Sequence, residues 1–142
     1  MDELKRYTNT FITEIYGNRV TQINTFQNEV PYQKRCEDSI RLCVKYPDYI
    51  PVIVNVNGTE IKLRKKKYLV PKDILASGFT AVIRSNVNLD KSQAMFLFCD
   101  DVLFCNMKFM GELYDSYKIR NNIKKDDDQY FYLTLCSENT FG

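Results

Sequence analysis

The chain has 142 residues, 44% of them hydrophobic and 27% charged, which is the composition of one globular domain and excludes disordered and fibrous chains. It contains no histidine, which excludes Ser-His and Cys-His catalysis and every zinc site that needs an imidazole ligand. Its 20 basic and 18 acidic residues leave a net charge of +2, too small to indicate a nucleic-acid-binding protein by itself. No apolar run approaches the roughly 20 residues that cross a bilayer, and the N-terminus carries no signal-peptide core. We therefore expect a soluble, intracellular protein.

The first twenty residues predict an amphipathic helix. Its apolar positions recur at helical spacing: Leu4, Tyr7, Phe11, Ile12, Ile15 and Tyr16. Gly17-Asn18 follows as a stop signal. This helix either packs on the domain, which we favour, or contacts a membrane surface or a partner. We expect residues 1–20 to be an extension of a domain that spans residues 21–142.

Two further helical segments precede the first strand. Residues 21–28 are polar and support at most a short helical turn before Pro31. A longer helix is predicted over residues 33–45, where Pro47 ends it. Its apolar positions are Cys36, Ile40, Cys43 and Val44.

A hairpin and a helix follow. The β-branched run over residues 50–56 and the turn dipeptide Asn57-Gly58 predict a first strand and its turn. The partner strand is predicted over residues 60–70, and Pro71 closes it because proline cannot donate to a ladder. Residues 73–86 carry an apolar stripe at helical spacing, so we expect this helix to pack across the sheet.

The C-terminal half predicts a second hairpin, a helix and a last strand. Residues 94–99 and 102–104 form the hairpin around Asp100-Asp101. A helix follows through Met107, Met110, Leu113, Tyr114 and Tyr117. Residues 118–128 are highly charged and predict an exposed loop, and residues 130–136 form the last strand. The fold class is therefore α+β, with the ββαββαβ order of a ubiquitin-like β-grasp fold preceded by N-terminal helices.

Five cysteines form an odd set without a C-x-x-C pair: Cys36, Cys43, Cys99, Cys105 and Cys136. This pattern fits neither a disulfide framework nor a four-cysteine zinc site. We expect reduced, mostly buried thiols, with no metal and no cofactor. A reactive cysteine stays open as an alternative, and only a helix N-terminus or a Lys or Arg could lower its pKa.

Six blocks of sequence carry a resemblance closer than fold class. They are Lys45-Tyr46-Pro47-Asp48 with Ile50-Pro51-Val52-Ile53-Val54, then Lys65 to Pro71, Phe79 with Ile83-Arg84, Ala94 to Phe98, Met110 to Tyr114, and Ser137 to Gly142. In this order the blocks resemble the autophagy-related protein 8 family of ubiquitin-like modifiers, which includes the GABA-receptor-associated and light chain 3 proteins. The resemblance covers about Tyr32 to Gly142.

The resemblance implies conjugation through Gly142 to the amino group of phosphatidylethanolamine. A terminal glycine has no Cβ, so its carboxylate can thread a narrow enzyme channel and be attacked by an amine with little hindrance. The implied partners are ubiquitin-activating-like and ubiquitin-conjugating-like enzymes and a processing or delipidating cysteine protease. The modifier itself would not be an enzyme. It would be cytoplasmic, and peripheral on autophagosomal or related membranes after lipidation.

The resemblance also implies that short peptides with an aromatic-x-x-aliphatic motif, carried by cargo receptors and autophagy proteins, add to the edge strand around residues 67–70. The positions that match the aromatic pocket are Asp38, Leu42, Pro51, Lys65, Lys67, Leu69 and Tyr130. Those that match the aliphatic pocket are Tyr68, Val70, Pro71, Ile74, Phe79 and Val82. Arg84 matches a basic position near the other end of the peptide.

Periodicity alone offers plainer interpretations. It assigns Leu69, Val70, Ile74, Phe79 and Val82 to the core, and it assigns the basic residues of 62–67 to a solvated strand face. Two other functions stay open: an unconjugated, soluble peptide-binding adaptor, and an RNA-binding domain in which Tyr68 stacks on a base. The second is disfavoured because no aromatic pair at ribonucleoprotein-motif spacing accompanies the basic run, so we expect no nucleic-acid partner.

Three departures from the family pattern concern motif preference and partners. Tyr49 stands where the family usually has arginine, and Tyr130 stands where phenylalanine is common. The loop over residues 118–128 is several residues longer than usual, which suggests a partner contact or mere mobility.

Overall fold

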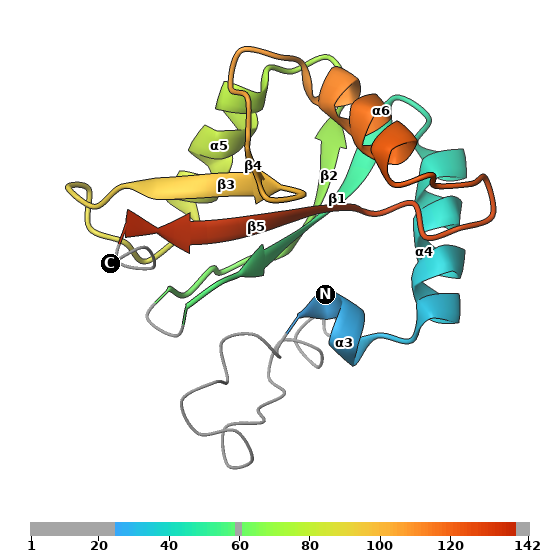
Figure 1. Ribbon diagram of the computed structural model, residues 1–142, viewed down its shortest axis with the longest axis horizontal. Coiled ribbons are helices and arrows are strands. Elements are labelled where there is room, and N and C mark those ends of the chain that lie inside the picture. The colour runs from blue at the N-terminus through green and yellow to red at the C-terminus, as the bar shows by residue number, and fades with distance from the viewer. Residues whose placement is uncertain (1–24, 59–60, 139–142) are drawn as a thin grey trace.

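The structure, a computed structural model, describes residues 25–58 and 61–138. In this part of the chain, one five-stranded sheet carries helices on both of its faces (Figure 1). The elements in chain order are α3 (Phe26–Glu29), α4 (Tyr32–Lys45), β1 (Tyr49–Val56), β2 (Lys67–Pro71), α5 (Ala76–Ser85), β3 (Met95–Cys99), β4 (Val102–Leu103), α6 (Met110–Arg120) and β5 (Phe131–Ser137). This order confirms the predicted α+β, ubiquitin-like class.

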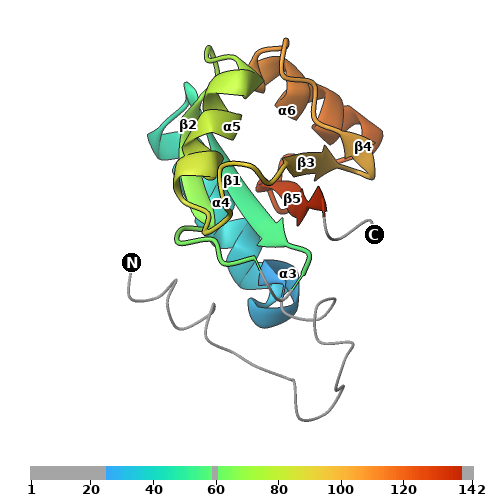
Figure 2. The ribbon, with the colours of Figure 1, turned by 90° about the vertical axis from the view of Figure 1, so that its left-hand side faces the viewer.

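The sheet has the strand order β2-β1-β5-β3-β4. β1 and β5 pair in parallel from Val52↔Phe131 to Val56↔Leu135, and every other strand pair is antiparallel. The sheet separates α5 and α6 from α3 and α4 (Figure 2). This order leaves β2 and β4 at the two edges of the sheet.

Two apolar clusters occupy the two faces of the sheet. The larger lies under α5 and α6, where Phe79, Ile83 and Met110 pack on the inner strands. The smaller comprises Phe26, Val30, Ile53 and Tyr130, with Leu42 and Tyr132 against it. Successive residues of β1 enter different clusters because side chains of a strand alternate between its faces.

The predicted helical turn before Pro31 is confirmed as α3. Thr25 caps it by accepting from the Asn28 amide at 3.2 Å, and the Phe26 amide donates to Asn55 of β1 at 2.9 Å. The predicted helix over residues 33–45 is confirmed as α4. The helix predicted within residues 1–20, and with it the proposed extension, lies outside the described residues.

The partner strand predicted over residues 60–70 is wrong in its first part, since β2 begins only at Lys67. Residues 62–64 pair instead with the segment at the end of α5 and after it. The Arg64 amide donates to the Asn86 carbonyl at 2.8 Å, and Leu63 forms a bridge with Val87. Because these backbone groups find partners after α5, they do not continue the ladder of the hairpin.

The helix predicted over residues 73–86 begins three residues late, at Ala76. The segment before it pairs with the segment before α6: the Met110 amide donates to the Ile74 carbonyl at 2.8 Å, and the Gly111 amide donates to the Lys72 carbonyl at 2.9 Å. A Cβ at Gly111 would lie 3.1 Å from the Cβ and the carbonyl oxygen of Lys72. The close approach of these two segments therefore leaves little room for a side chain at this position.

The second hairpin is confirmed. Asp100 and Asp101 have φ values of 52° and 65°, as a two-residue turn between right-twisted strands requires. The last strand is also confirmed, as β5. All five cysteines are free, and Cys36, Cys99 and Cys136 are buried, so the expectation of mostly buried thiols holds.

The charged region around α6 differs from the prediction. α6 begins at Met110, so the predicted helical position Met107 lies outside it and is 83% exposed. The helix continues to Arg120, three residues into the predicted loop, where the guanidinium reaches Asp100 at 3.1 Å. At the other end of that loop Asp128 is buried. Charge patterning cannot distinguish the last turn of a helix from a loop.

Within the described ranges, no helix is long and apolar enough to cross a membrane. The same residues contain no group of three or more His, Cys, Asp or Glu side chains arranged to hold a metal ion.

Gly111→Ala is expected to lower the free energy of unfolding by about 1 kcal/mol, because the new methyl group comes within 3.1 Å of Lys72 and forces the two segments apart. The matched control is Gly78→Ala in α5, where a Cβ meets no atom within 4 Å. It should raise stability by about 0.5 kcal/mol, since alanine restricts the unfolded chain. Urea denaturation of both variants measures the difference, and equal effects would contradict the proposed close approach.

Candidate functional site

The candidate site surrounds β2, an edge strand that pairs with β1 alone in the described sheet. The register runs from Tyr49↔Pro71 to Ile53↔Lys67. α5 covers one face of this edge and α4 lies on the other (Figure 2). An edge strand can accept another extended segment because one row of its backbone groups faces outward. Its side chains alternate, so each face of β2 presents a different set.

On the α4 face, the structure gathers most of the residues assigned to the aromatic pocket. Leu69 is 37% exposed and lies opposite the buried Pro51 of β1. The Lys67 ammonium lies 5.5 Å from the centroid of the Tyr130 ring, and Leu42 of α4 packs against the cluster that contains this ring. Apolar side chains thus form the floor on this face, and an ammonium lies over it.

Two residues assigned to the same pocket have charged groups that already contact other side chains. The Asp38 carboxylate lies 3.3 Å from the Lys34 ammonium and 3.5 Å from the Arg41 guanidinium, both within α4. The Lys65 ammonium lies 5.4 Å from the centroid of the Tyr68 ring. Lys65 is therefore placed beside a residue of the other set.

On the α5 face, the residues assigned to the aliphatic pocket divide into a floor and a rim. Tyr68, Val70 and Phe79 are buried. The Tyr68 and Phe79 rings pack edge to face, with their centroids 5.4 Å apart. The hydroxyl of Tyr68 donates to the Lys65 carbonyl, and burial raises the pKa of this tyrosine to about 12. The rim consists of the half-buried Pro71 and Ile74 and the 44% exposed Val82.

Periodicity is confirmed at Val70 and Phe79, which belong to the core, and their assignment to the aliphatic pocket stays a prediction. The core assignment of Leu69 and Val82 is wrong, because both side chains are exposed. Arg84 is not gathered with either set. Its guanidinium donates to the Asp90 carbonyl at 2.7 Å. Gly142 lies outside the described residues.

Sequence reasoning missed an ion pair that positions the floor of the α4 face. The Arg35 guanidinium contacts the Asp128 carboxylate at 2.9 Å and donates to the Val30 carbonyl at 3.0 Å. The same carboxylate accepts from the Tyr132 hydroxyl and from the Tyr130 amide at 3.0 Å. Asp128 thus fixes α4 against the start of β5, beside the Tyr130 ring. Arg35 and Asp128 are separated by 93 residues, and no local pattern joins them.

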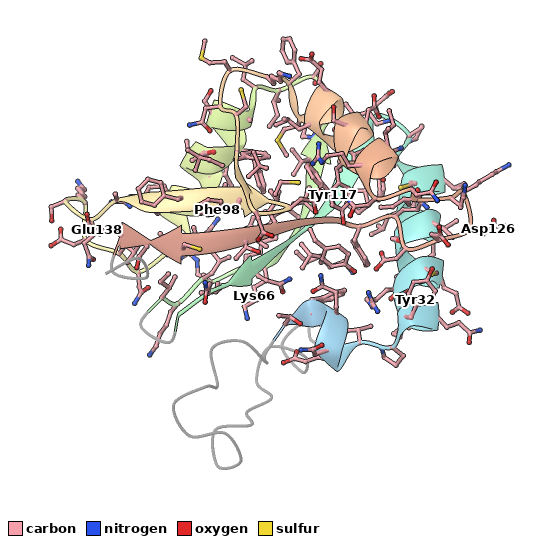
Figure 3. All side chains as sticks on the ribbon, in the orientation of Figure 1. Tyr32, Lys66, Phe98, Tyr117, Asp126 and Glu138 are labelled. Carbon is pink, nitrogen blue, oxygen red and sulfur yellow. The ribbon has the colours of Figure 1, made fainter. Side chains whose placement is uncertain are left out.

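Glu29 of α3 and Lys66, just before β2, are near enough for each charge to influence the pKa of the other group. Figure 3 shows Lys66 on the side of the sheet that faces α3. Burial raises the pKa of Glu29 to about 7, although the nearby Lys66 charge lowers it in part. Burial also lowers the pKa of Lys66. One carboxylate oxygen of Glu29 is buried without a hydrogen-bond partner among the described residues, which is the unfavourable setting that favours the neutral acid.

Comparisons with known proteins agree with this arrangement. The family model for the autophagy protein Atg8, described as ubiquitin like, matches residues 34–142. Autophagy-related protein 8 of Coccidioides immitis is 40% identical over 119 residues, which are 82% of this chain and 96% of that protein. The Mycosarcoma maydis protein of the same name is 38% identical over 121 residues, covering 84% of this chain and 97% of its own length.

Solved structures show the same fold. The Trypanosoma brucei ATG8 structure superposes with a TM-score of 0.69 at 28% identity, over 82% of this chain and 97% of that chain. Plasmodium falciparum Atg8, solved in complex with a Plasmodium falciparum Atg3 peptide, gives a TM-score of 0.65 at 24% identity, over 78% of this chain and 94% of that chain.

Arg35→Met is expected to lower the free energy of unfolding by about 2 kcal/mol, because it leaves the buried Asp128 carboxylate without its cation. Arg41→Met on the same helix is the matched control. Arg41 is 63% exposed in its ion pair with Asp38, so its loss should cost less than about 1 kcal/mol. Chemical denaturation compares the two variants. Equal losses of unfolding free energy would show that the Arg35 pair stabilises the fold no more than an exposed pair does.

Glu29→Gln is expected to flatten part of the pH dependence of stability. The folded-state pKa of Glu29 is raised from its ordinary 4.5 to about 7, so the folded chain binds the proton more tightly than the unfolded chain. The contribution of Glu29 to the free energy of unfolding then falls as pH rises from about 4.5 to about 7. Glu37→Gln, on the exposed side of α4, is the control that keeps this fall. Denaturation midpoints across this pH range test it, and an unchanged slope in Glu29→Gln would refute it.

Proposed function

Because the chain belongs to the Atg8 family of ubiquitin-like autophagy proteins, we propose that it is conjugated through Gly142 to phosphatidylethanolamine and displays the β2 edge to short peptide motifs. In this role it is a ubiquitin-like modifier of autophagy, and it catalyses no step itself. Conjugation places it on autophagosomal or related membranes as a peripheral protein. Before conjugation it is cytoplasmic.

The arrangement of side chains on the two faces of β2 supports the proposed peptide binding. In an extended peptide, residues three positions apart point to opposite faces, about 10 Å apart along the strand. The two candidate sets also lie on opposite faces of β2, one around Leu69 and Tyr130 and one around Val70 and Phe79. An aromatic-x-x-aliphatic segment added beside β2 therefore directs one anchor to each set.

Charge supports the same occupant. Lys65 is exposed and Lys67 is half-buried, and both flank the start of the edge strand. Ammonium groups at this position attract acidic residues that precede the aromatic anchor of a motif. The proposed ligands are therefore acidic aromatic-x-x-aliphatic segments of cargo receptors and of other autophagy proteins.

The chemistry of the tail determines the other proposed partners. A carboxylate must be adenylated and carried as a thioester before an amine can attack it, so the proposal requires an activating-like and a conjugating-like enzyme. A cysteine protease would process the tail or release the lipid. The Glu138 amide donates to the Ala94 carbonyl at 3.1 Å, so the chain leaves the sheet beside β3, four residues before Gly142.

Two other functions were open from the sequence. An unconjugated adaptor would keep the β2 edge but gain no lipid, so mass spectrometry separates it from the modifier. The RNA-binding alternative loses its stacking residue, because Tyr68 is only 8% exposed and packs against Phe79. A base cannot stack on a ring that is buried in the core.

The native chain is expected to gain one phosphatidylethanolamine when incubated with its activating and conjugating enzymes, ATP and liposomes of that lipid. Gly142→Ala should gain none, because the added methyl group obstructs the acyl transfer. Gly78→Ala in α5 is the control that keeps the reaction. Intact mass spectrometry with fragmentation locates the adduct, and an unmodified native chain with active enzymes would overturn conjugation.

Leu69→Asp is expected to weaken binding of an acidic aromatic-x-x-aliphatic peptide by more than about tenfold, or 1.4 kcal/mol, because it puts a carboxylate among the apolar side chains of the α4 face. Leu103→Asp is the matched control: Leu103 is 56% exposed and lies in β4, at the opposite edge of the sheet. Calorimetric titration measures both dissociation constants. Equal weakening in the two variants would argue against docking at β2.

A further inference from the structure

A hollow of about 770 Å³ lies between the last turns of α6 and the loop that leads to β5. Its lining includes Asp115, Lys118, Ile119, Ile123, Lys124 and Lys125. None of these residues belongs to the two sets around β2. The hollow is therefore separate from the site proposed above.

The loop that walls this hollow is held by its own hydrogen bonds. The Ile123 amide donates to the Lys118 carbonyl at 2.9 Å. The Lys124 amide donates to the Asp127 carboxylate at 2.6 Å, and the Gln129 side chain donates to the Lys124 carbonyl at 2.7 Å. The hollow thus has a defined shape before any ligand arrives, which lowers the entropic cost of binding.

The charge of the lining favours an acidic occupant. Three ammonium groups, from Lys118, Lys124 and Lys125, face one carboxylate, that of Asp115. Asp115 lies 4.0 Å from Lys118, whereas Lys124 and Lys125 have no ion pair anywhere in residues 25–58 and 61–138.

Two of the three neighbouring acids of the loop are engaged in other contacts, and the third, Asp126, is exposed beside Lys125. Asp127 accepts from the Tyr32 hydroxyl of α4 at 3.1 Å, and Asp128 pairs with Arg35. Asp128 is thus held toward α4, whereas the Asp127 carboxylate lies between Tyr32 of α4 and the Lys124 amide of the loop. The ammonium groups of Lys124 and Lys125 form no ion pair with any of these three carboxylates in the described part of the chain.

The lining also offers an apolar anchor point. Ile119 is 81% exposed, and Ile123 is half-buried. An exposed isoleucine between ammonium groups is complementary to a segment that carries an apolar side chain among acidic residues.

The position of the hollow favours a protein over the anchoring membrane. Glu138 and Asp126 lie at opposite ends of the molecule (Figure 3), and the four residues from Glu138 to Gly142 reach at most about 14 Å. If Gly142 is joined to lipid as proposed above, this loop faces away from that membrane. This step rests on the proposed conjugation, but the charge and shape of the hollow do not.

We propose that the hollow between α6 and the loop before β5 is a second docking site, which binds an acidic peptide segment with an aliphatic side chain at its centre. A modifier with two separate sites can hold two segments of one partner at once. Joining two weak contacts in this way raises the overall affinity without any new contact.

The test uses the full chain, isotope-labelled for NMR, and the peptide Gly-Glu-Asp-Glu-Leu-Glu-Asp-Glu-Gly, which has no aromatic anchor for the β2 edge. The proposal expects the largest shift changes within residues 115–129. The variant Lys124→Glu with Lys125→Glu should lose more than about tenfold in affinity. The matched control, Lys91→Glu with Lys108→Glu, makes the same change of charge at exposed positions elsewhere and should lose less than about threefold.

Several outcomes overturn the proposal. Equal losses in the two double variants mean non-specific attraction, and shift changes confined to residues 65–71 mean binding at β2. Absence of binding to the peptide, together with loop-dependent binding to phosphatidylserine vesicles, means a membrane contact. Leu69→Asp and Gly142→Ala should both keep the loop shifts, so failure of the β2 site or of conjugation is distinguished from failure of this site.

Discussion

The parallel pairing of β1 with β5 at the centre of the sheet is the constraint on which the other features depend. It joins the first strand to the last, from Val52↔Phe131 to Val56↔Leu135. Because β5 occupies one side of β1, β2 occupies the other and becomes an edge. The chain then leaves the sheet from β5 beside β3. One pairing therefore determines both the strand proposed for peptides and the end of the domain from which the tail departs.

The helices on the two faces turn this edge into two different surfaces. α5 brings Phe79 against Tyr68, whereas α4 reaches the other face through the ion pair of Arg35 with Asp128. Asp128 also lies at the end of the loop that walls the hollow beside α6. One buried carboxylate therefore connects the floor of the aromatic set with the loop of the proposed acidic-peptide site. Removal of either partner of a buried pair leaves an uncompensated charge, so we expect both surfaces to depend on this contact.

Much of the fold could be predicted because its signals are local. The apolar run of β1, the helix α4 and the turn at Asp100-Asp101 follow from periodicity and turn chemistry. The errors arise where distant segments compete for backbone partners, as at Leu63 with Val87 and at Met110 with Ile74. The resemblance assigned candidate residues to the two faces of β2, whereas periodicity misassigned the exposed Leu69. Neither could find the Arg35 pair, which joins residues 93 positions apart. Neither could find the hollow, because its shape depends on the path of a charged loop.

A structure of the chain with a bound acidic aromatic-x-x-aliphatic peptide tests the central claim most directly. The account predicts an added strand beside β2, with the aromatic side chain on the α4 face near Leu69 and Tyr130 and the aliphatic side chain on the α5 face near Val82. A peptide bound away from β2, or with both anchors on one face of the strand, would contradict it.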